Sequence, residues 1–505
     1  MPDIADIFAK LRTHVAETAY LSSASSLLQW DQQTGMPPAG DSFRADQLAY
    51  FSTLVHERTT SAAYGEMIET LAASELVKAP YSDEGATIRV LKREYDRERK
   101  IPATLVAELT RVESLAQQAW VAARKANDFK SFAPHLETIF RLKREVAEAV
   151  GFVHHPYDAL LDQFEPELTT PEANRLLAGL RDELRPLVQA VTQSAKRAPV
   201  EILKRSFPTS LQSQLGKHIA GELGFSFAAG RLDTTAHPFC QTVGPGDCRI
   251  TTRYDEHFVQ MSFFGILHEA GHGMYEQGLR GAWYGLPPGS ACSLGVHESQ
   301  SRLWENLVGR SRAFWTWCLP LAKAVFPESL AGVSADDFYF AVNEAKPSLI
   351  RVEADEVTYN LHIIIRSELE QELLDGRLKV ADLPTAWNER YQKYLGISPT
   401  SDAEGVLQDV HWSAGLVGYF PTYSLGNIYA SCLYEAADKA LGGLDAMFAR
   451  GEFAPLLEWL RKCVHQHGQT RPAAMLIEEA CGTKPTHGPL ISHLRVKYGG
   501  LYGFA

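Results

Sequence analysis

Two histidines stand four residues apart near the middle of the chain, with a glutamate directly after the first. His268, Glu269 and His272 form the pattern H-E-x-x-H within the stretch GILHEAGHGMYEQG. On an α-helix, residues four apart project from one face in adjacent turns, so both imidazoles can reach one cation. In this pattern the histidines bind zinc and the glutamate handles the proton of a metal-bound water. The spacing therefore predicts a hydrolytic zinc site on a helix.

The bare pattern has an ordinary alternative, which is a helix whose histidines are surface or core residues. With 17 His in 505 residues, chance produces it in roughly one chain of this size in twenty-five. Three glycines in the same stretch, Gly265, Gly271 and Gly273, favour a functional site. Each costs about 0.8–1 kcal/mol relative to alanine inside a helix, so we expect another backbone or a ligand to approach closely there.

A catalytic zinc needs a third protein ligand and an open position for water. After a break at GLPPGSACSLG, the chain reads VHESQSRLWENLVGR, which has a helical pattern and begins with His297 and Glu298. Glu298 follows His272 by 26 positions, enough for a turn and a returning helix, so Glu298 is predicted as the third ligand. His297 competes with it, but helix neighbours point about 100° apart, so only one of the two should face the ion.

Long amphipathic helices account for most of the remaining sequence. Residues 102–126 and 170–198 place apolar side chains every three to four positions. The best strand candidate is CRITTRY, residues 248–254, paired with HPFCQTV, residues 237–243, across the turn at residues 244–246. The predicted fold is therefore mainly α, with a small β hairpin near the metal site.

No repeat, low-complexity tract or long linker divides the sequence, so residues 1–505 are predicted to form a single catalytic domain. A chain of this length usually divides its core, so we expect two lobes with a cleft between them. A cleft of that kind suits an enzyme.

The composition bears on partners and location. The chain has 49 Lys and Arg against 61 Asp and Glu, which argues against a nucleic-acid or anionic-membrane partner. Seven cysteines without a C-x-x-C motif fit a reducing cytoplasm better than a disulfide framework. The N-terminal stretch lacks the pattern of a signal peptide, and the glycines and Pro421 of uncharged residues 413–434 would interrupt a membrane span. We expect a cytoplasmic protein.

Six sequence blocks, taken in order, resemble those of the thermostable carboxypeptidase 1 family of metallocarboxypeptidases, also called the carboxypeptidase Taq family. They are HPF at 237–239, DCRIT at 247–251, HEAGH at 268–272, HESQ at 297–300, IRVEAD at 350–355 and GVLQDVHW at 405–412. The stretch LLQWDQQTGMPPAG at residues 27–40 also resembles the family. The similarity thus spans nearly the whole chain and shows no departure at a metal or catalytic position.

The resemblance implies a mainly helical, gluzincin-type metallopeptidase fold, related to angiotensin-converting enzyme and thimet oligopeptidase, with two lobes flanking a deep groove. It implies hydrolysis of the C-terminal peptide bond of peptides with broad specificity. It also implies a homodimer and a Zn²⁺ cofactor, with Co²⁺ as a possible replacement. With the HESQ block included, Glu298 is preferred to His297 as the third metal ligand.

The expected mechanism uses a metal-activated water. With zinc held by His268, His272 and Glu298, the pKa of the bound water falls to about 7, so the water becomes a nucleophile. Glu269 is expected to accept its proton as a general base, and then to deliver that proton to the departing amine as a general acid.

Attack on the scissile carbonyl creates an oxyanion that needs further hydrogen-bond donors. His411 and Tyr423 resemble the histidine and tyrosine that thimet-type peptidases aim at the transition state, so both are predicted to be catalytic. The alternative for each is a hydrogen-bonded core residue, with Tyr419 as the fallback tyrosine. Asp409 either orients His411 or caps a helix.

An exopeptidase must also recognise a terminal carboxylate, which calls for a guanidinium. Arg351 in the IRVEAD block is the first candidate, and its alternative is a surface ion pair with Asp355 one helical turn away. Arg249 and Arg253 on the predicted hairpin are rivals, one of which could instead close the groove. His237 either lines the substrate pocket or forms a hydrogen bond in a turn.

Three other functions compete with this one. An endo-acting oligopeptidase would share the metal chemistry, but it would need a groove open at both ends and no carboxylate-binding arginine. A non-catalytic helical binding protein with a structural zinc is disfavoured, because such a site has four protein ligands and no need of Glu269. A Cys/His site from His237, Cys240 and Cys248 lacks a fourth ligand at recognisable spacing.

Overall fold

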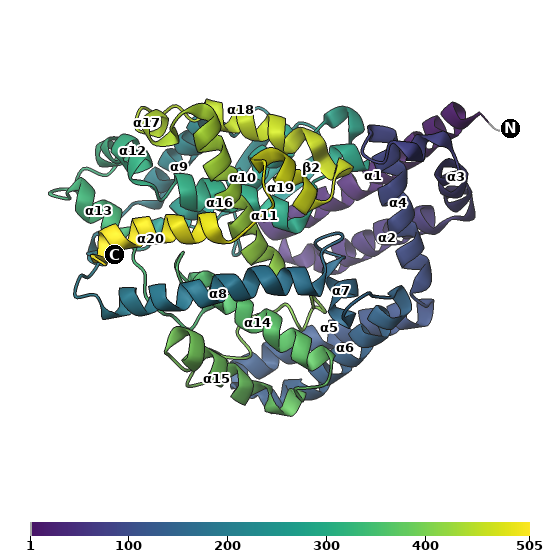
Figure 1. The fold of residues 1–505 in the computed structure, drawn as a ribbon, viewed down its shortest axis with the longest axis horizontal. Helices are drawn as coiled ribbons and strands as arrows, with labels where there is room; N and C mark the ends of the chain where they lie inside the picture. Colours follow the sequence, from purple (N-terminus) through teal and green to yellow (C-terminus); the bar gives the residue numbers. More distant parts are fainter. Residues whose placement is uncertain (1–2, 505) are drawn as a thin grey trace. The chain divides into compact units, whose positions relative to one another are not determined.

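The computed structural model describes residues 3–504, and Figure 1 shows that the chain is mainly helical. The chain divides into two compact units, each assembled from three stretches of sequence. Unit 1 contains residues 3–99, 199–342 and 433–484, and unit 2 contains residues 100–198, 343–432 and 485–504. The prediction of a mainly α fold with a small sheet is confirmed. The assignment of residues 1–505 to a single catalytic domain stays a prediction.

Unit 1 carries the sheet and most of the shorter helices. Its helices are α1 (Ile4–Thr34), α2 (Asp41–Thr60), α3 (Ala62–Ala72), α4 (Asp83–Lys100), α9 (Thr209–Leu223), α10 (Val259–Gly278), α11 (Leu294–Arg302), α12 (Arg312–Val325), α13 (Ala335–Ala341), α17 (Leu444–Phe448), α18 (Ala454–Cys463) and α19 (Ala473–Cys481). Leu11, Ile68, Leu71 and Ile88 belong to the hydrophobic cluster that holds α1, α3 and α4 together.

The described residues of unit 2 form helices and loops, with no strand. Its helices are α5 (Ala103–Ala126), α6 (Phe129–Val150), α7 (Pro156–Leu161), α8 (Thr170–Gln193), α14 (Tyr359–Leu374), α15 (Leu383–Leu395) and α20 (Gly488–Tyr502), and α16 (Pro421–Leu441) contains the boundary with unit 1. The helix predicted at 102–126 is confirmed, and the one predicted at 170–198 ends five residues early. No helix within residues 3–504 is both long and apolar enough to cross a membrane.

The sheet of unit 1 has three strands: β1 (Gly230–Thr234), β2 (Cys240–Gly244) and β3 (Asp247–Thr252), in the order β1-β3-β2. β2 and β3 are antiparallel, with Cys240 opposite Ile250, so the predicted hairpin is confirmed. Gly246 in its turn has a φ of 83°, a left-handed value that glycine adopts without the steric cost of a Cβ.

β1, which pairs in parallel with β3, was not predicted from the sequence. Its five residues read GRLDT, and among them only Leu232 is buried. A single apolar residue cannot produce the alternation by which a strand is recognised. The pairing of β1 therefore depends on β3, whose Cys248 lies 18 positions after its partner Gly230, rather than on a pattern within β1.

α10 contacts β2, β3, α9 and α11 in unit 1. Its apolar side chains Ile266, Leu267, Ala270 and Met274 are fully buried, with the three-to-four-residue spacing of a helix face. Because these side chains fix the rotation of α10, they also fix the direction in which its histidines point.

Candidate metal centre and active site

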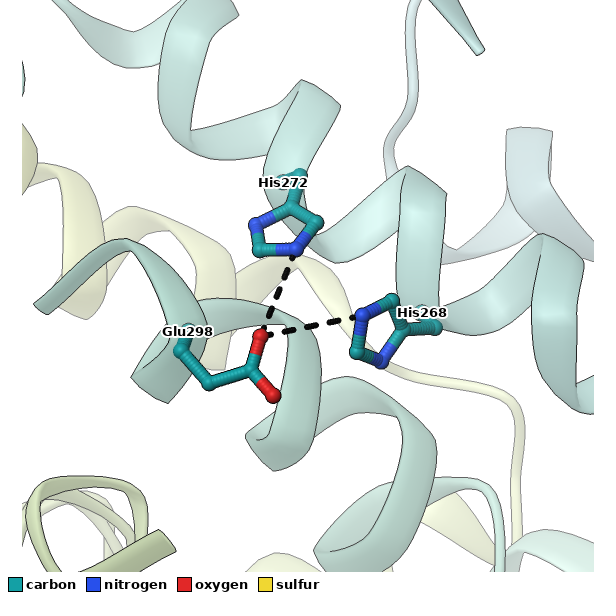
Figure 2. Close-up of side chains that lie close together, drawn as sticks. All are labelled: His268, His272 and Glu298. Carbon is teal, nitrogen blue, oxygen red and sulfur yellow. Dashed lines mark ion pairs between the residues drawn. The ribbon is translucent and has the colours of Figure 1, made fainter. Parts of the chain in front are cut away.

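His268 and His272 project from α10 toward Glu298 on α11, as Figure 2 shows. Nε2 of His268 lies 3.7 Å, and Nε2 of His272 lies 3.5 Å, from Oε2 of Glu298. Within the described part of the chain, these three residues are the one group of His, Cys, Asp or Glu whose ligand atoms lie within 4.8 Å of one another.

The donor set and its spacing fit a divalent metal ion. Zinc bonds nitrogen and oxygen ligands at about 2.0–2.2 Å, and a tetrahedral arrangement then separates neighbouring ligand atoms by about 3.4 Å. The observed separations of 3.7 and 3.5 Å are close to that value. Two imidazoles and one carboxylate suit zinc and related transition metals, and three protein ligands leave a position open for catalysis.

Glycine at position 271 allows α10 and α11 to approach closely. A Cβ on Gly271 would lie 2.7 Å from both the carbonyl oxygen of Gln300 and Cα of Ser301, which belong to α11. The close backbone approach expected from the glycines therefore occurs at this residue. At Gly265, by contrast, a Cβ would lie 3.4 Å from its nearest atom. Steric crowding therefore does not require glycine at position 265.

Each histidine of the three-residue group has a second partner on the side away from Glu298. Nδ1 of His268 lies 2.9 Å from Oε2 of Glu305, and Nδ1 of His272 lies 2.5 Å from Nδ1 of His297. Nε2 of His297 in turn lies 2.9 Å from Oε1 of Glu276. His297, the predicted rival of Glu298, thus lies on the side of His272 away from the three-ligand group.

Glu276 and Glu305 are not among the site residues predicted from the sequence. Glu276 stands four positions after His272 on α10, and so shares the helix face of the two histidines. Glu305 lies in a π-helical segment, Leu303–Val308, that follows α11 directly. The repeated four-residue spacing was an available signal for Glu276, whereas nothing local distinguished Glu305.

Charges around the three-residue group are balanced by a partly buried arginine, Arg302. Nε of Arg302 donates to Oε1 of Glu298 at 2.7 Å, and Oγ of Ser301 donates to Oε2 at 3.0 Å. Burial alone would raise the pKa of Glu305, but the Arg302 guanidinium and the His268 hydrogen bond together lower it to about 2. Glu298 and Glu305 are therefore held in fixed orientations, with Glu305 ionised.

Glu269, adjacent to His268, is the predicted general base. Its side chain is only 6% exposed. Burial raises the pKa of Glu269 to about 7, against the lowering effect of His268. A carboxyl group with a pKa near neutrality can both accept and release a proton under physiological conditions.

A second cluster of predicted residues lies in unit 2. Nε2 of His411 is 3.2 Å from the hydroxyl of Tyr423, and both side chains contact Phe420. Burial, aided by the positive charges of Arg351 and Arg366, lowers the pKa of His411 to about 4. His411 is therefore a neutral imidazole at pH 7 and can exchange a hydrogen bond with the tyrosine.

Comparison with known proteins identifies the family. The chain matches the carboxypeptidase Taq (M32) metallopeptidase profile over residues 10–498. The chain belongs to the carboxypeptidase Taq family. Thermostable carboxypeptidase 1 of Thermus thermophilus is 46% identical over 497 residues, covering 96% of this chain and 97% of that protein. Carboxypeptidase 1 of Bacillus subtilis is 41% identical, covering 96% of each chain.

Solved structures agree with this assignment. The crystal structure of the M32 carboxypeptidase from Deinococcus radiodurans matches with a TM-score of 0.95 at 40% identity, covering 99% of this chain and 100% of that one. Metallocarboxypeptidase 1 of Trypanosoma cruzi matches with a TM-score of 0.90 at 31% identity, covering 98% of this chain and all of that one. The chain is accordingly a metallocarboxypeptidase of the carboxypeptidase Taq family.

Arg351, the first candidate for binding a substrate carboxylate in this carboxypeptidase, already has a carboxylate partner. Its Nε and Nη2 donate to Oδ1 of Asp409 at 2.9 and 2.8 Å, and its Nη1 donates to the hydroxyl of Tyr359 at 3.3 Å. Asp409 also accepts from Nε of Arg366 at 2.6 Å. Arg351 is thus a buried residue paired with Asp409, and the alternative of a surface pair with Asp355 is not formed.

Asp409 contacts His411 less closely than an orienting residue should. Its Oδ1 lies 3.9 Å from Nδ1 of His411, which is beyond hydrogen-bond reach. The two arginines that Asp409 neutralises, Arg351 and Arg366, are its direct partners instead.

The remaining substrate-binding candidates of the carboxypeptidase lie around the sheet. Nε and Nη2 of Arg249 each donate to the carboxylate of Asp247 at 2.8 Å, and the guanidinium lies 4.4 Å from the ring centre of Trp30. Arg253 is exposed and donates to the carbonyl of Ala236. His237 is also exposed. Arg249 is thus engaged within unit 1, whereas Arg253 and His237 present accessible side chains.

Proposed function

We propose that this metallocarboxypeptidase removes single C-terminal residues from peptides with broad specificity, using Zn²⁺, or Co²⁺ in its place, at His268, His272 and Glu298. The observation that carries the proposal is the open three-ligand group beside a buried glutamate whose pKa is near 7. A bound ion would supply a Lewis acid that polarises the scissile carbonyl and activates water.

Glu269 is the residue to which we assign the proton transfers. Its carboxylate accepts a proton from the attacking water and then, as a carboxylic acid, donates it to the departing amine. Burial keeps the two protonation states close in free energy at neutral pH, because it removes the preference of the carboxyl group for its charged form.

We assign stabilisation of the oxyanion to His411 and Tyr423. Their mutual hydrogen bond fixes a neutral imidazole and a phenol as a pair, and preorganised donors of this kind contribute roughly 2.7–4 kcal/mol each to a transition state. Tyr419, whose ring centre lies 5.5 Å from that of His411, remains the fallback tyrosine.

Recognition of the substrate carboxylate is assigned first to Arg351, with Arg249 and Arg253 as rivals and His237 in the pocket wall. In Arg351 and Arg249, Nε and one N–H of Nη2 already donate to Asp409 and Asp247, so a substrate carboxylate would have to bind through the remaining N–H groups of Nη1 and Nη2. Substituting each arginine with lysine separates the candidates, because the loss of bidentate geometry should raise KM for free-acid peptides only at the true site.

The partners we propose are peptides with a free C-terminus and a second copy of this chain, and the location we propose is the cytoplasm. Support comes from the family resemblance, from seven cysteines that form no disulfide and from the excess of acidic residues. Neither nucleic acid nor membrane is proposed as a partner. Sedimentation equilibrium of the purified chain would test the homodimer.

The reaction is tested by mass spectrometry of an N-terminally blocked peptide and its C-terminal amide, each incubated with metal-loaded and with chelated protein. We expect stepwise loss of single residues from the free-acid peptide alone, and no loss after chelation. Internal cleavage of both peptides would instead support an endo-acting oligopeptidase. The same assay with Glu269→Gln should show binding of metal without hydrolysis, whereas unchanged hydrolysis would remove Glu269 from the mechanism.

A further inference from the structure

Two cysteine thiols lie side by side on the sheet of unit 1. Sγ of Cys240 on β2 is 3.5 Å from Sγ of Cys248 on β3. Cys240 is partly exposed, Cys248 is 2% exposed, and neither forms a disulfide. The pair is thus a reduced dithiol formed by one partly exposed and one buried residue.

The strand register makes this pair better suited to sharing a bound atom than to forming a disulfide. Cys240 lies opposite Ile250 and Cys248 lies opposite Thr242, so the two cysteines are diagonal neighbours. Cα atoms of diagonal residues are about 7–8 Å apart, beyond the separation that a disulfide spans without backbone movement. Two thiolates on one tetrahedral zinc, by comparison, have sulfurs about 3.8 Å apart, close to the observed 3.5 Å.

The surroundings of the pair decide which kind of atom can bind. A soft divalent cation prefers three or four protein ligands. In the part of the chain that the structure describes, no third Cys, His, Asp or Glu lies close enough to these sulfurs to complete such a set. A monosubstituted trivalent arsenical needs only two thiols, because its third bond is already made to carbon.

We propose that Cys240 and Cys248 form a binding site for monosubstituted trivalent arsenicals, and that occupation of this site impairs the metal centre. In the reaction, R–As(OH)₂ and two thiols form two As–S bonds. Two As–O bonds break, and two waters leave with the thiol protons. Arsenic stays trivalent, so neither an oxidant nor a reductant is needed.

A short chain of contacts connects the dithiol to a metal ligand. Oγ1 of Thr242 lies 3.7 Å from Sγ of Cys248 and donates to Oε2 of Glu276 at 3.0 Å. Glu276 holds His297, which contacts His272. An arsenic atom bridging the sulfurs would displace Thr242, which would weaken the hydrogen bond that orients Glu276. The inhibitory part of this inference rests on the proposed metal chemistry, whereas binding by the dithiol does not.

The protonated state of the thiols predicts a difference in reactivity between alkylating reagents and arsenicals. The Cys248 hydrogen bond and burial, followed by the negative charges of Glu269 and Glu276, raise the pKa of the Cys240 thiol well above its usual range. Single-thiol alkylation requires a thiolate, so iodoacetamide should react slowly at this pair. The condensation with an arsenical uses protonated thiols and releases water, so it should proceed.

The experiment treats metal-loaded, full-length protein with phenylarsine oxide, then measures intact mass, metal content and peptide hydrolysis. We expect one phenylarsenic group per chain and a fall in kcat/KM of about tenfold or more, in line with the loss of a contact that orients a metal ligand. Excess 2,3-dimercaptopropanol should remove the group and restore activity, whereas an equal excess of a monothiol should not.

Two variants make the assignment specific. Cys240→Ala should retain hydrolysis, bind no phenylarsenic group and resist inhibition. The matched control Cys463→Ser, which changes another partly exposed cysteine, should behave like the unmodified chain. Labelling that persists in Cys240→Ala would overturn the site. Labelling at Cys240 and Cys248 without loss of activity would overturn the coupling between the dithiol and the metal centre. If the chain has no peptidase activity but still takes up one phenylarsenic group, the proposed function fails and the arsenical site stands.

Discussion

His272 and His297 meet through their Nδ1 atoms, 2.5 Å apart. Nε2 of His272 faces Glu298. To bind a metal ion through Nε2, the His272 ring must keep the lone pair on Nε2 and carry its proton on Nδ1. Nδ1 of His272 then donates to His297, and Nε2 of His297 donates to Glu276. Glu276 thus sets the tautomers of both rings, in the way that hydrogen-bonded partners orient metal-binding histidines.

Glu276→Gln should therefore weaken metal binding without unfolding unit 1. A glutamine amide can present its NH₂ to His297 and favour the wrong tautomer, so we expect metal affinity to fall about 10–100-fold. Competition with a chromogenic chelator measures the affinity. The control is Glu458→Gln on the exposed face of α18, which should bind metal like the unmodified chain. An equal metal affinity in the two variants would contradict the role of Glu276 in setting the tautomers.

Gly271→Ala should disturb the metal centre through the backbone. The new Cβ would lie 2.7 Å from Gln300 and Ser301, so α11 must move and carry Glu298 with it. We expect a loss of about 1–3 kcal/mol in the free energy of unfolding, together with weaker metal binding. Urea denaturation and metal titration measure the two effects.

Gly265→Ala in the same helix is the matched control for that substitution. Its nearest neighbour, Oγ1 of Thr252, would lie 3.4 Å from the new Cβ. The variant should be neutral, or more stable by up to about 1 kcal/mol because alanine favours the helix. A similar loss in the free energy of unfolding in both variants would show that the close approach of α10 and α11 does not require glycine at position 271.

Asp409→Asn should be strongly destabilising. It would leave the guanidinium groups of Arg351 and Arg366, which are 6% and 0% exposed, without their shared counter-charge. Breaking a buried ion pair by removing one partner costs about 3–5 kcal/mol. The surface pair of Arg312 and Asp336 offers a control, because Asp336→Asn should cost no more than about 1 kcal/mol. Thermal unfolding of both variants decides the comparison.

His465 should make the protein less stable in mild acid. Burial, with smaller contributions from Arg461 and His297, lowers its pKa from 6.5 to about 3. Above about pH 6.5 both folded and unfolded states carry a neutral ring. Between about pH 6.5 and 3 only the unfolded state gains the proton, so the free energy of unfolding falls as the pH falls. The loss should reach about 2 kcal/mol at about pH 5, at 1.36 kcal/mol per pKa unit.

His465→Gln tests this source of acid lability. In the folded protein Nε2 of His465 lies 2.9 Å from Oε1 of Gln300, and a glutamine amide can donate the same bond without titrating. Urea denaturation at about pH 7 and pH 5 should show a smaller loss of stability in the variant. An unchanged loss would assign the acid lability to other groups.

The sequence by itself determined the parts of this protein that depend on local spacing. Four-residue spacing identified His268 and His272, helical periodicity predicted the dominant class of structure, and a Gly-Pro-Gly turn between β-favouring runs predicted the hairpin of β2 and β3. Glu298 was also predicted, because a returning helix 26 positions after His272 could bring a carboxylate back. These features follow from the fixed geometry of a helix or a hairpin.

Tertiary structure alone decided which distant groups became partners. Asp409 pairs with Arg351 across 58 positions, His465 reaches Gln300 across 165, and Glu305 holds His268 from a π-helical segment with no recognisable signal. The register of β2 against β3 likewise set the separation of the two thiols. Such pairings depend on how helices and strands rotate and pack against one another, and no local periodicity in a sequence records that.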